Sequence, residues 1–205
     1  MNWAGDMFSA VLDTSVLWPS LQRDFLLSLA AERTYSPKWS TAILDELVFH
    51  EAEKLAARGS LPDEAKQSAQ RLIDQMSGAF DDALVTGWEP LEGTYGLPDP
   101  DDEHVLATAV MCDAEVIVTE NLRDFPASKL PAPIRAIPAR DFVHDTVRAH
   151  LTQSCKAVIA ICDRSGRHGP KLTAPDLLNI LDGRYGMTRA VELLTAAPGL
   201  RKHLD

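Results

Sequence analysis

Two short apolar runs, each followed directly by polar residues, constrain the fold of this chain more than any other feature. Residues 8–12 and 115–119 have the length and apolar character of buried strands. Weaker strand patterns occur at residues 35–39, 83–85 and 134–137. Because segments with helical spacing separate these strands, the pattern predicts an α/β fold in which helices cover a parallel sheet.

Helical spacing of apolar residues predicts the other elements and a change of character near residue 140. An acidic helix is expected to begin at Pro100, and the other expected helices cover residues 19–33, 40–59, 62–82, 140–161, 173–183 and 187–197. A proline-rich turn separates the mixed part of the chain from an all-helical part. We therefore expect a sheet-bearing domain over residues 1–140 and a helical C-terminal module over residues 141–205.

The charge of the chain is unevenly distributed, and this distribution limits the classes of molecule that the chain is expected to bind. Residues 1–140 carry 11 basic and 23 acidic side chains, a net charge of −12. Residues 141–205 carry 9 basic and 7 acidic side chains, a net charge of +2. An acidic body argues against a protein that coats DNA in general, although it permits a local basic rim around an acidic site.

The remaining composition indicates a cytoplasmic protein without a membrane partner. No apolar run is long enough to span a membrane, and the first residues lack a signal-peptide pattern. The three cysteines are too few for a disulfide framework, which fits a reducing compartment. Cys155 and Cys162 lack metal-binding spacing, so we interpret them as core residues.

An acidic segment at residues 98–109 combines a helix start with a carboxylate on the apolar side of the helix. Asp99 is suited to cap this helix and Pro100 to its first position. Asp102 heads the apolar stripe, which continues through residues 105–109 at helical spacing. An ionised carboxylate in that position is costly unless it meets a cation or a metal ion.

Polar side chains also follow both buried strands. Asp13 comes directly after the first strand, and residues 119–124 follow the second. The carboxyl ends of parallel strands share one edge of a sheet, where α/β proteins form their binding sites. Carboxylates about 4 Å apart repel each other by about 4 kcal/mol at an effective dielectric constant of about 20. Such a cluster favours Mg²⁺ or Mn²⁺, which prefer oxygen ligands and support water activation during phosphodiester cleavage.

Four runs of the sequence resemble, in order, the motifs of PIN-domain nucleases. They are residues 11–17, 43–47, 102–109 and 116–125. The similarity is greatest to the VapC-like toxins of type II toxin–antitoxin systems. It implies a PIN-like α/β fold, with the nuclease domain over residues 1–140 and a Mg²⁺-dependent endoribonuclease activity for which Mn²⁺ is an alternative. It also implies an RNA substrate and a cognate antitoxin protein, and leaves a homodimer open.

The resemblance assigns roles to individual residues. Asp13, Glu46 and Asp102 match three acidic positions that would be catalytic and hold the metal ion. Many relatives have an aspartate where this chain has Asn121, so the fourth position falls either to Asn121 or to Asp124, one turn further on. Hydroxyl groups beside the carboxylates are expected to support them, namely those of Thr14, Ser15 and Thr119.

Some of these assignments have alternatives within the sequence. The helical pattern does not choose between Asp45 and Glu46, since both lie away from the apolar stripe. Asp13 could instead serve only as the N-cap of the helix that follows. His50 and His104 are expected at the surface or behind the ligands, because hard oxygen sites do not need imidazole.

Parts of the sequence also fit two other functions. Asn121 could mark a PIN fold that has lost catalysis and acts as an interaction module for RNA or for a protein. A phosphotransferase of the dehalogenase-like class also begins with an aspartate after a strand. That class needs a second aspartate two residues later, where this chain has Ser15, and it is therefore disfavoured.

Overall fold

The computed structural model describes residues 8–167 and 169–204 and divides the chain into two compact units. The sheet unit comprises Ser9–Pro19 and Pro37–Ile137. The helical unit comprises Phe8, Ser20–Ser36 and the described residues from Pro138 onward. This division differs from a single boundary at residue 140, because residues 20–36 group with the C-terminal helices.

Four strands form one sheet in the order β2-β1-β3-β4. They are β1 (Ser9–Leu12), β2 (Ser36–Lys38), β3 (Val116–Val118) and β4 (Arg135–Ile137). β3 pairs in parallel with both β1 and β4, and Leu12 lies opposite Val118 at the carboxyl ends. β3 is buried throughout and β1 nearly so, which explains their continuous apolar runs. The predicted helix-covered parallel sheet is confirmed.

The expectation of a strand at residues 83–85 is wrong, since these residues form only a single parallel bridge to Trp39. The Trp39 N–H donates to the carbonyl of Ala83 at 3.0 Å, and the Val85 N–H donates to the carbonyl of Trp39 at 2.9 Å. The chain then turns at Gly87, where φ is +77°, so the pairing does not extend into a ladder.

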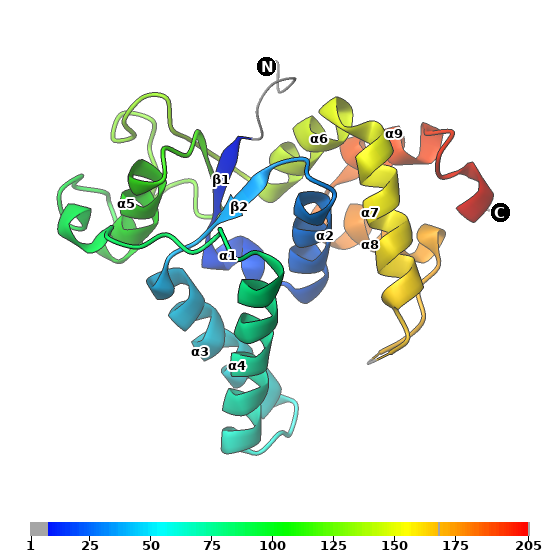
Figure 1. Cartoon of the computed structure of the whole chain (residues 1–205), viewed down its shortest axis with the longest axis horizontal. Coiled ribbons are helices and arrows are strands. Elements are labelled where there is room, and N and C mark those ends of the chain that lie inside the picture. The colour runs from blue at the N-terminus through cyan, green and yellow to red at the C-terminus, as the bar shows by residue number, and fades with distance from the viewer. Residues whose placement is uncertain (1–7, 168, 205) are drawn as a thin grey trace. The chain divides into compact units, whose positions relative to one another are not determined.

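Helices of the sheet unit cover and flank the strands. They are α1 (Thr14–Leu17), α3 (Thr41–Ala57), α4 (Pro62–Ala79), η1 (Glu89–Leu91), η2 (Pro100–Asp102) and α5 (Glu103–Met111). α3 and α4 lie side by side as a hairpin, and α5 packs on β1 and β3 (Figure 1). α3 begins where predicted, because the Ser40 Oγ accepts a hydrogen bond from the Ile43 N–H at 3.3 Å.

The helical unit joins α2 to the C-terminal helices. Its helices are α2 (Ser20–Ala31), α6 (Ala139–Ala149), α7 (Leu151–Arg164), α8 (Ala174–Tyr185), α9 (Thr188–Ala196) and η3 (Arg201–His203). α2 packs along α7, and Arg164 of α7 forms an ion pair with Asp24 of α2 at 2.6 Å. The Tyr35 and Phe142 rings meet edge to face, with centroids 4.8 Å apart.

The single helix expected over residues 140–161 is wrong, because the helix breaks at His150. This residue has φ −130° and ψ 50°, outside the helical region. Hydroxyls on both sides bond back to main-chain carbonyls, Thr146 to Phe142 at 2.8 Å and Ser154 to His150 at 2.9 Å, which favours bending. The break lets α6 pack on α9 while α7 packs on α2. Within residues 8–167 and 169–204, no helix has both the length and the apolar character needed to cross a membrane.

Candidate active site

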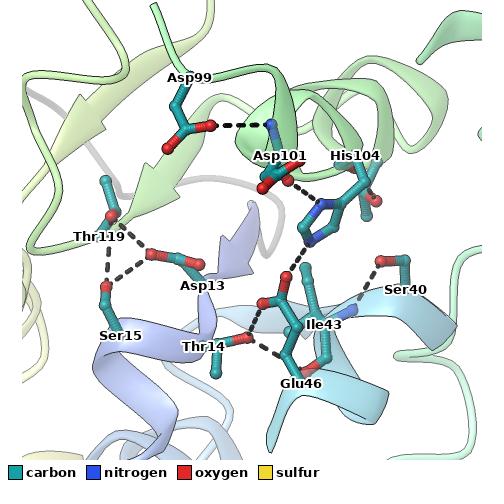
Figure 2. A network of polar contacts seen from close by, with 11 residues as sticks. Asp13, Thr14, Ser15, Ser40, Ile43, Glu46, Asp99, Asp101, His104 and Thr119 are labelled. Atoms are coloured by element: carbon teal, nitrogen blue, oxygen red, sulfur yellow. Dashed lines mark hydrogen bonds and ion pairs between the residues drawn. The ribbon is translucent and has the colours of Figure 1, made fainter. Parts of the chain in front are cut away.

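Asp13 lies at the carboxyl end of β1, where the strand passes directly into α1. It occupies the N-cap position of α1, but its side chain makes no capping hydrogen bond. Instead, its Oδ2 accepts hydrogen bonds from the Ser15 Oγ at 2.6 Å and from the Thr119 Oγ1 at 2.7 Å (Figure 2). The carboxylate is therefore held across the sheet edge by hydroxyls from α1 and from the residue after β3.

The same two hydroxyls bind the loop that follows β3. The Ser15 Oγ accepts from the Glu120 N–H at 3.0 Å, and the Thr119 Oγ1 accepts from the Asn121 N–H at 2.9 Å. Each hydroxyl thus donates to Asp13 and accepts from the backbone, which satisfies both of its functions. A residue without a hydroxyl at either position would leave a buried acceptor or a backbone donor without this partner.

Glu46 reaches the same region from α3. Its Oε2 accepts a hydrogen bond from the Thr14 Oγ1 at 2.7 Å, and this hydroxyl also lies 3.2 Å from the carbonyl of Ile43. Asp45, one residue earlier, is exposed and lines a different groove between α3 and α4. The structure therefore brings Glu46, and not Asp45, beside the residues that follow β1.

His104 lies behind Glu46 rather than at the surface, with only 4% of the residue exposed. Its Nδ1 is 2.7 Å from the carbonyl oxygen of Asp101, and because a carbonyl only accepts, Nδ1 carries the hydrogen. Its Nε2 lies 3.6 Å from the Glu46 Oε1 (Figure 2). The imidazole thus connects the start of α5 to α3. The sequence indicated the contact of His104 with Asp101, because the two residues are one helical turn apart. It did not indicate the contact with Glu46, which belongs to a different helix.

Asp102 lies at the end of η2, just before α5. The Asp99 Oδ1 accepts from the Asp101 N–H at 3.0 Å, so the predicted cap at Asp99 is present. Burial raises the pKa of Asp102 to about 7, and the negative charges of four other carboxylates add to this rise, those of Asp13, Asp124, Asp99 and Glu46. The acidic residues therefore act on one another electrostatically, although they come from separate elements.

Glu103 follows Asp102 but serves a different purpose. Its carboxylate accepts from the Tyr95 N–H at 3.1 Å and the Leu97 N–H at 3.0 Å, and only 2% of the residue is exposed. Burial alone would raise the pKa of Glu103, but backbone hydrogen bonds, including these two, outweigh burial and lower it. Glu103 thus anchors the loop before η2 and is turned to the backbone of this loop.

We expect Asp102→Asn to stabilise the metal-free protein at alkaline pH. The folded state holds the Asp102 proton up to about pH 7, whereas the unfolded chain releases it near 3.8, so the free energy of unfolding falls as pH rises through this window. Ionising Asp102 in the folded state lowers the free energy of unfolding, and asparagine removes this cost. Because Asp102 is partly exposed and solvent screens its charge, we expect the difference to be about 1–2 kcal/mol.

Thermal or urea unfolding in the presence of a chelator measures this difference. The variant should be more stable than the parent chain at about pH 8 and about equally stable at about pH 2.5, well below 3.8, where the carboxyl is protonated in both the folded and the unfolded state. Asp101→Asn is the matched control, because Asp101 is exposed and adjacent. Equal stability of Asp102→Asn and the parent at both pH values would contradict the described environment of Asp102.

A pocket of about 410 Å³ joins most of the predicted site residues. It is lined by Asp13, Thr14, Ser15, Trp18, Glu46, His50, Asp102 and Asn121. Asp124 does not line this pocket, although its charge reaches Asp102, and Thr119 lies behind Asp13. Trp18 and His50 were not predicted as pocket residues. The sequence places Trp18 one helical turn after Thr14, at the end of α1, and this spacing was the available signal.

The residues of this pocket fit a hard divalent cation in the type and charge of their donors. Carboxylate and amide oxygens are ligands that Mg²⁺ and Mn²⁺ prefer, and the mutual repulsion at Asp102 is what a cation would relieve. As the side chains stand, no three His, Cys, Asp or Glu residues in the described part of the chain are placed to hold a metal ion. The fit therefore concerns donor chemistry and charge, and not a closed set of ligands.

The comparison with protein families identifies the class of this fold and site. The sequence profile of the family described as PIN domain matches residues 9–123, more than half of the chain. The chain therefore belongs to the PIN-domain family.

Similarity to a particular relative covers a shorter segment. Over 59 residues the chain is 48% identical to the protein named "Putative ribonuclease VapC50" of Mycobacterium tuberculosis (strain ATCC 25618 / H37Rv). The matched segment covers 28% of this chain and spans about a third (34%) of the relative's length. No solved structure matches the chain. The predicted resemblance to VapC-like PIN proteins is thus confirmed.

Proposed function

We propose that this chain is a divalent-cation-dependent endoribonuclease and the toxin of a type II toxin–antitoxin pair. The observation that carries the proposal is the pocket at the ends of β1 and β3, where Asp13, Glu46 and Asp102 come together in a PIN-domain chain. The name of the mycobacterial relative supports RNA as the substrate. In this proposal the site lies within residues 1–140, in the sheet unit, and the protein acts in the cytoplasm.

In the proposed reaction, Asp13, Glu46 and Asp102 would hold the cation, and Asn121 or Asp124 would complete the site. When bound, Mg²⁺ or Mn²⁺ would supply water activation and neutralise charge on the phosphate. The chain itself contributes orientation. Ser15 and Thr119 hold one oxygen of Asp13, and Thr14 holds one oxygen of Glu46, so the remaining carboxylate oxygens are available.

Removal and return of divalent cations tests the proposal. We expect a chelator to abolish cleavage of single-stranded RNA, and Mg²⁺ or Mn²⁺ to restore it, because carboxylates alone cannot neutralise a phosphodiester. The cation should also raise the melting temperature, with a stabilisation of about 2.7 kcal/mol at a concentration of about 100 times its dissociation constant. Cleavage that survives complete removal of divalent cations would exclude this mechanism.

The alternative of a PIN fold without catalysis is favoured by one observation, the amide of Asn121 at the position where many PIN-domain nucleases have an aspartate. It predicts RNA or protein binding without cleavage under any of these metal conditions.

The toxin assignment has its own test. A small protein encoded beside this gene should bind the chain and suppress its cleavage of RNA. A neighbouring gene product that leaves cleavage unchanged would count against the toxin–antitoxin part of the proposal.

A further inference from the structure

Trp18 is a large aromatic residue exposed beside the carboxylates. It follows α1, and 44% of the residue is accessible to solvent. It lines the same pocket as Asp13, Glu46 and Asp102. Burial of an exposed indole against a ligand is favourable, so its place at this pocket points to a substrate contact.

Contacts with α3 fix the orientation of the Trp18 indole despite its exposure. The indole Nε1–H donates to the carbonyl of His50 at 3.3 Å, and the His50 ring meets the indole at a steep angle with centroids 6.5 Å apart. The Lys54 ammonium lies over the indole at 5.8 Å from the ring centroid and donates to the Trp18 carbonyl at 3.4 Å. An aromatic plane oriented in advance loses little conformational entropy when a ligand stacks on it.

The charges around Trp18 favour an uncharged aromatic ligand over a phosphate. Lys54 is paired with Glu51, and the His50 Nδ1 lies 3.8 Å from a carboxylate oxygen of Glu53. The carboxylates of the pocket repel any phosphate that is not bridged to them by a cation. Of the uncharged groups in a nucleic acid, the base is the one with an aromatic face that can stack on the indole.

We propose that the Trp18 indole stacks on one unpaired base of the RNA substrate, next to the phosphate at the carboxylates. This inference rests on the proposed ribonuclease function and narrows its substrate to RNA that is single-stranded at that position. Lys54 lies against one face of the indole, and the base occupies the other. Stacking on an aromatic side chain tolerates any base but requires that the base be unpaired.

Cleavage kinetics with modified RNA test the proposal. The probes are single-stranded RNAs of about twelve nucleotides, a length within typical single-strand site sizes, each with one abasic site at a different position. With intact RNA, Trp18→Ala should lower kcat/KM by about tenfold through KM, and Trp18→Phe should recover most of it. One abasic position should impair the parent chain by the same factor and leave Trp18→Ala unaffected. The loss should persist at raised salt, unlike a phosphate contact.

Phe49→Ala is the matched control, because Phe49 is an exposed aromatic residue like Trp18 but belongs to α3 and lines the groove between α3 and α4. It should cleave like the parent chain. Full activity of Trp18→Ala on every RNA would overturn the stacking proposal and leave the ribonuclease function standing. A role of Trp18 in binding a protein would give that result.

A binding measurement separates the two proposals if no RNA is cleaved. Tryptophan fluorescence is recorded in the Asp13→Asn chain with and without Trp18→Phe, while the intact and abasic RNAs are titrated. Quenching that depends on Trp18 and disappears with one abasic RNA supports stacking even where cleavage, and with it the proposed function, fails. Identical quenching with and without Trp18 overturns the inference whatever the cleavage assay shows.

Discussion

Replacing Asp13 with asparagine is expected to lower RNA cleavage by about a hundredfold to a thousandfold, the loss typical of a central electrostatic group in an active site. The asparagine side chain would keep the shape of the aspartate and one acceptor for the hydroxyls of Ser15 and Thr119, so the sheet edge should stay intact. The negative charge that would hold the proposed cation would be lost. Single-turnover cleavage with saturating Mg²⁺ measures the effect, and circular dichroism checks the fold.

Asp45→Asn is the control for this experiment, because it removes one negative charge from α3 without touching the carboxylate pocket. It should cleave RNA at the parent rate. A folded Asp13→Asn chain with parent activity would remove Asp13 from the site, whatever the outcome for Asp45. Equal losses in both variants would indicate a general effect of charge and not a ligand position.

The second large effect concerns the C-terminal helices. We expect a chain that ends at Ile137 not to fold, because α2 would lose α7, the helix against which it packs. Phe25, Leu26 and Leu29 of α2 are fully buried, and each such side chain contributes about 1.5–3 kcal/mol when buried. The free energy lost by exposing all three side chains is comparable to the free energy of unfolding of a typical domain, about 5–15 kcal/mol. Thermal unfolding and gel filtration of the truncated chain measure the result.

A chain that ends at Leu200 is the matched truncation. It lacks η3, whose residues Arg201–His203 are exposed, and keeps the buried Leu200. This shorter deletion should melt cooperatively close to the full-length temperature. If the chain ending at Ile137 is soluble, melts cooperatively and cleaves RNA, then residues 1–137 form a self-sufficient nuclease and α2 does not need α7.

The strands of the sheet could be predicted because fully buried strands leave continuous apolar runs. The partner of α2 could not be predicted in the same way. Apolar spacing in residues 20–31 shows which side of the helix is buried but not which element covers it, and α7 lies more than a hundred residues further along. The break at His150 was hidden for a related reason, since no glycine or proline marks it and the packing of α6 and α7 on different helices favours it.

For the candidate site, the sequence predicted a residue's place where its position in a strand or helix determines the direction of its side chain. Asp13 at a strand end and Asp102 at the head of an apolar stripe could be placed near one another from sequence. The choice of Glu46 over Asp45 could not be made from α3 alone, because it depends on the hydroxyl of Thr14, 32 residues earlier. The role of Trp18 could not be predicted from sequence, because its contacts come from His50 and Lys54, which only the folded α3 brings beside it.

The hydrogen bond from Thr119 to Asp13 has a consequence for the order in which the protein is made. The two residues are 106 positions apart, so a ribosome completes β1 and Asp13 long before the hydroxyl that holds the carboxylate exists. At about 5–20 residues per second, this interval lasts about 5 to 20 seconds. A nascent chain that stops before Thr119 carries the acidic residues without the assembled pocket. Interrupted translation would thus release fragments that lack the proposed nuclease site.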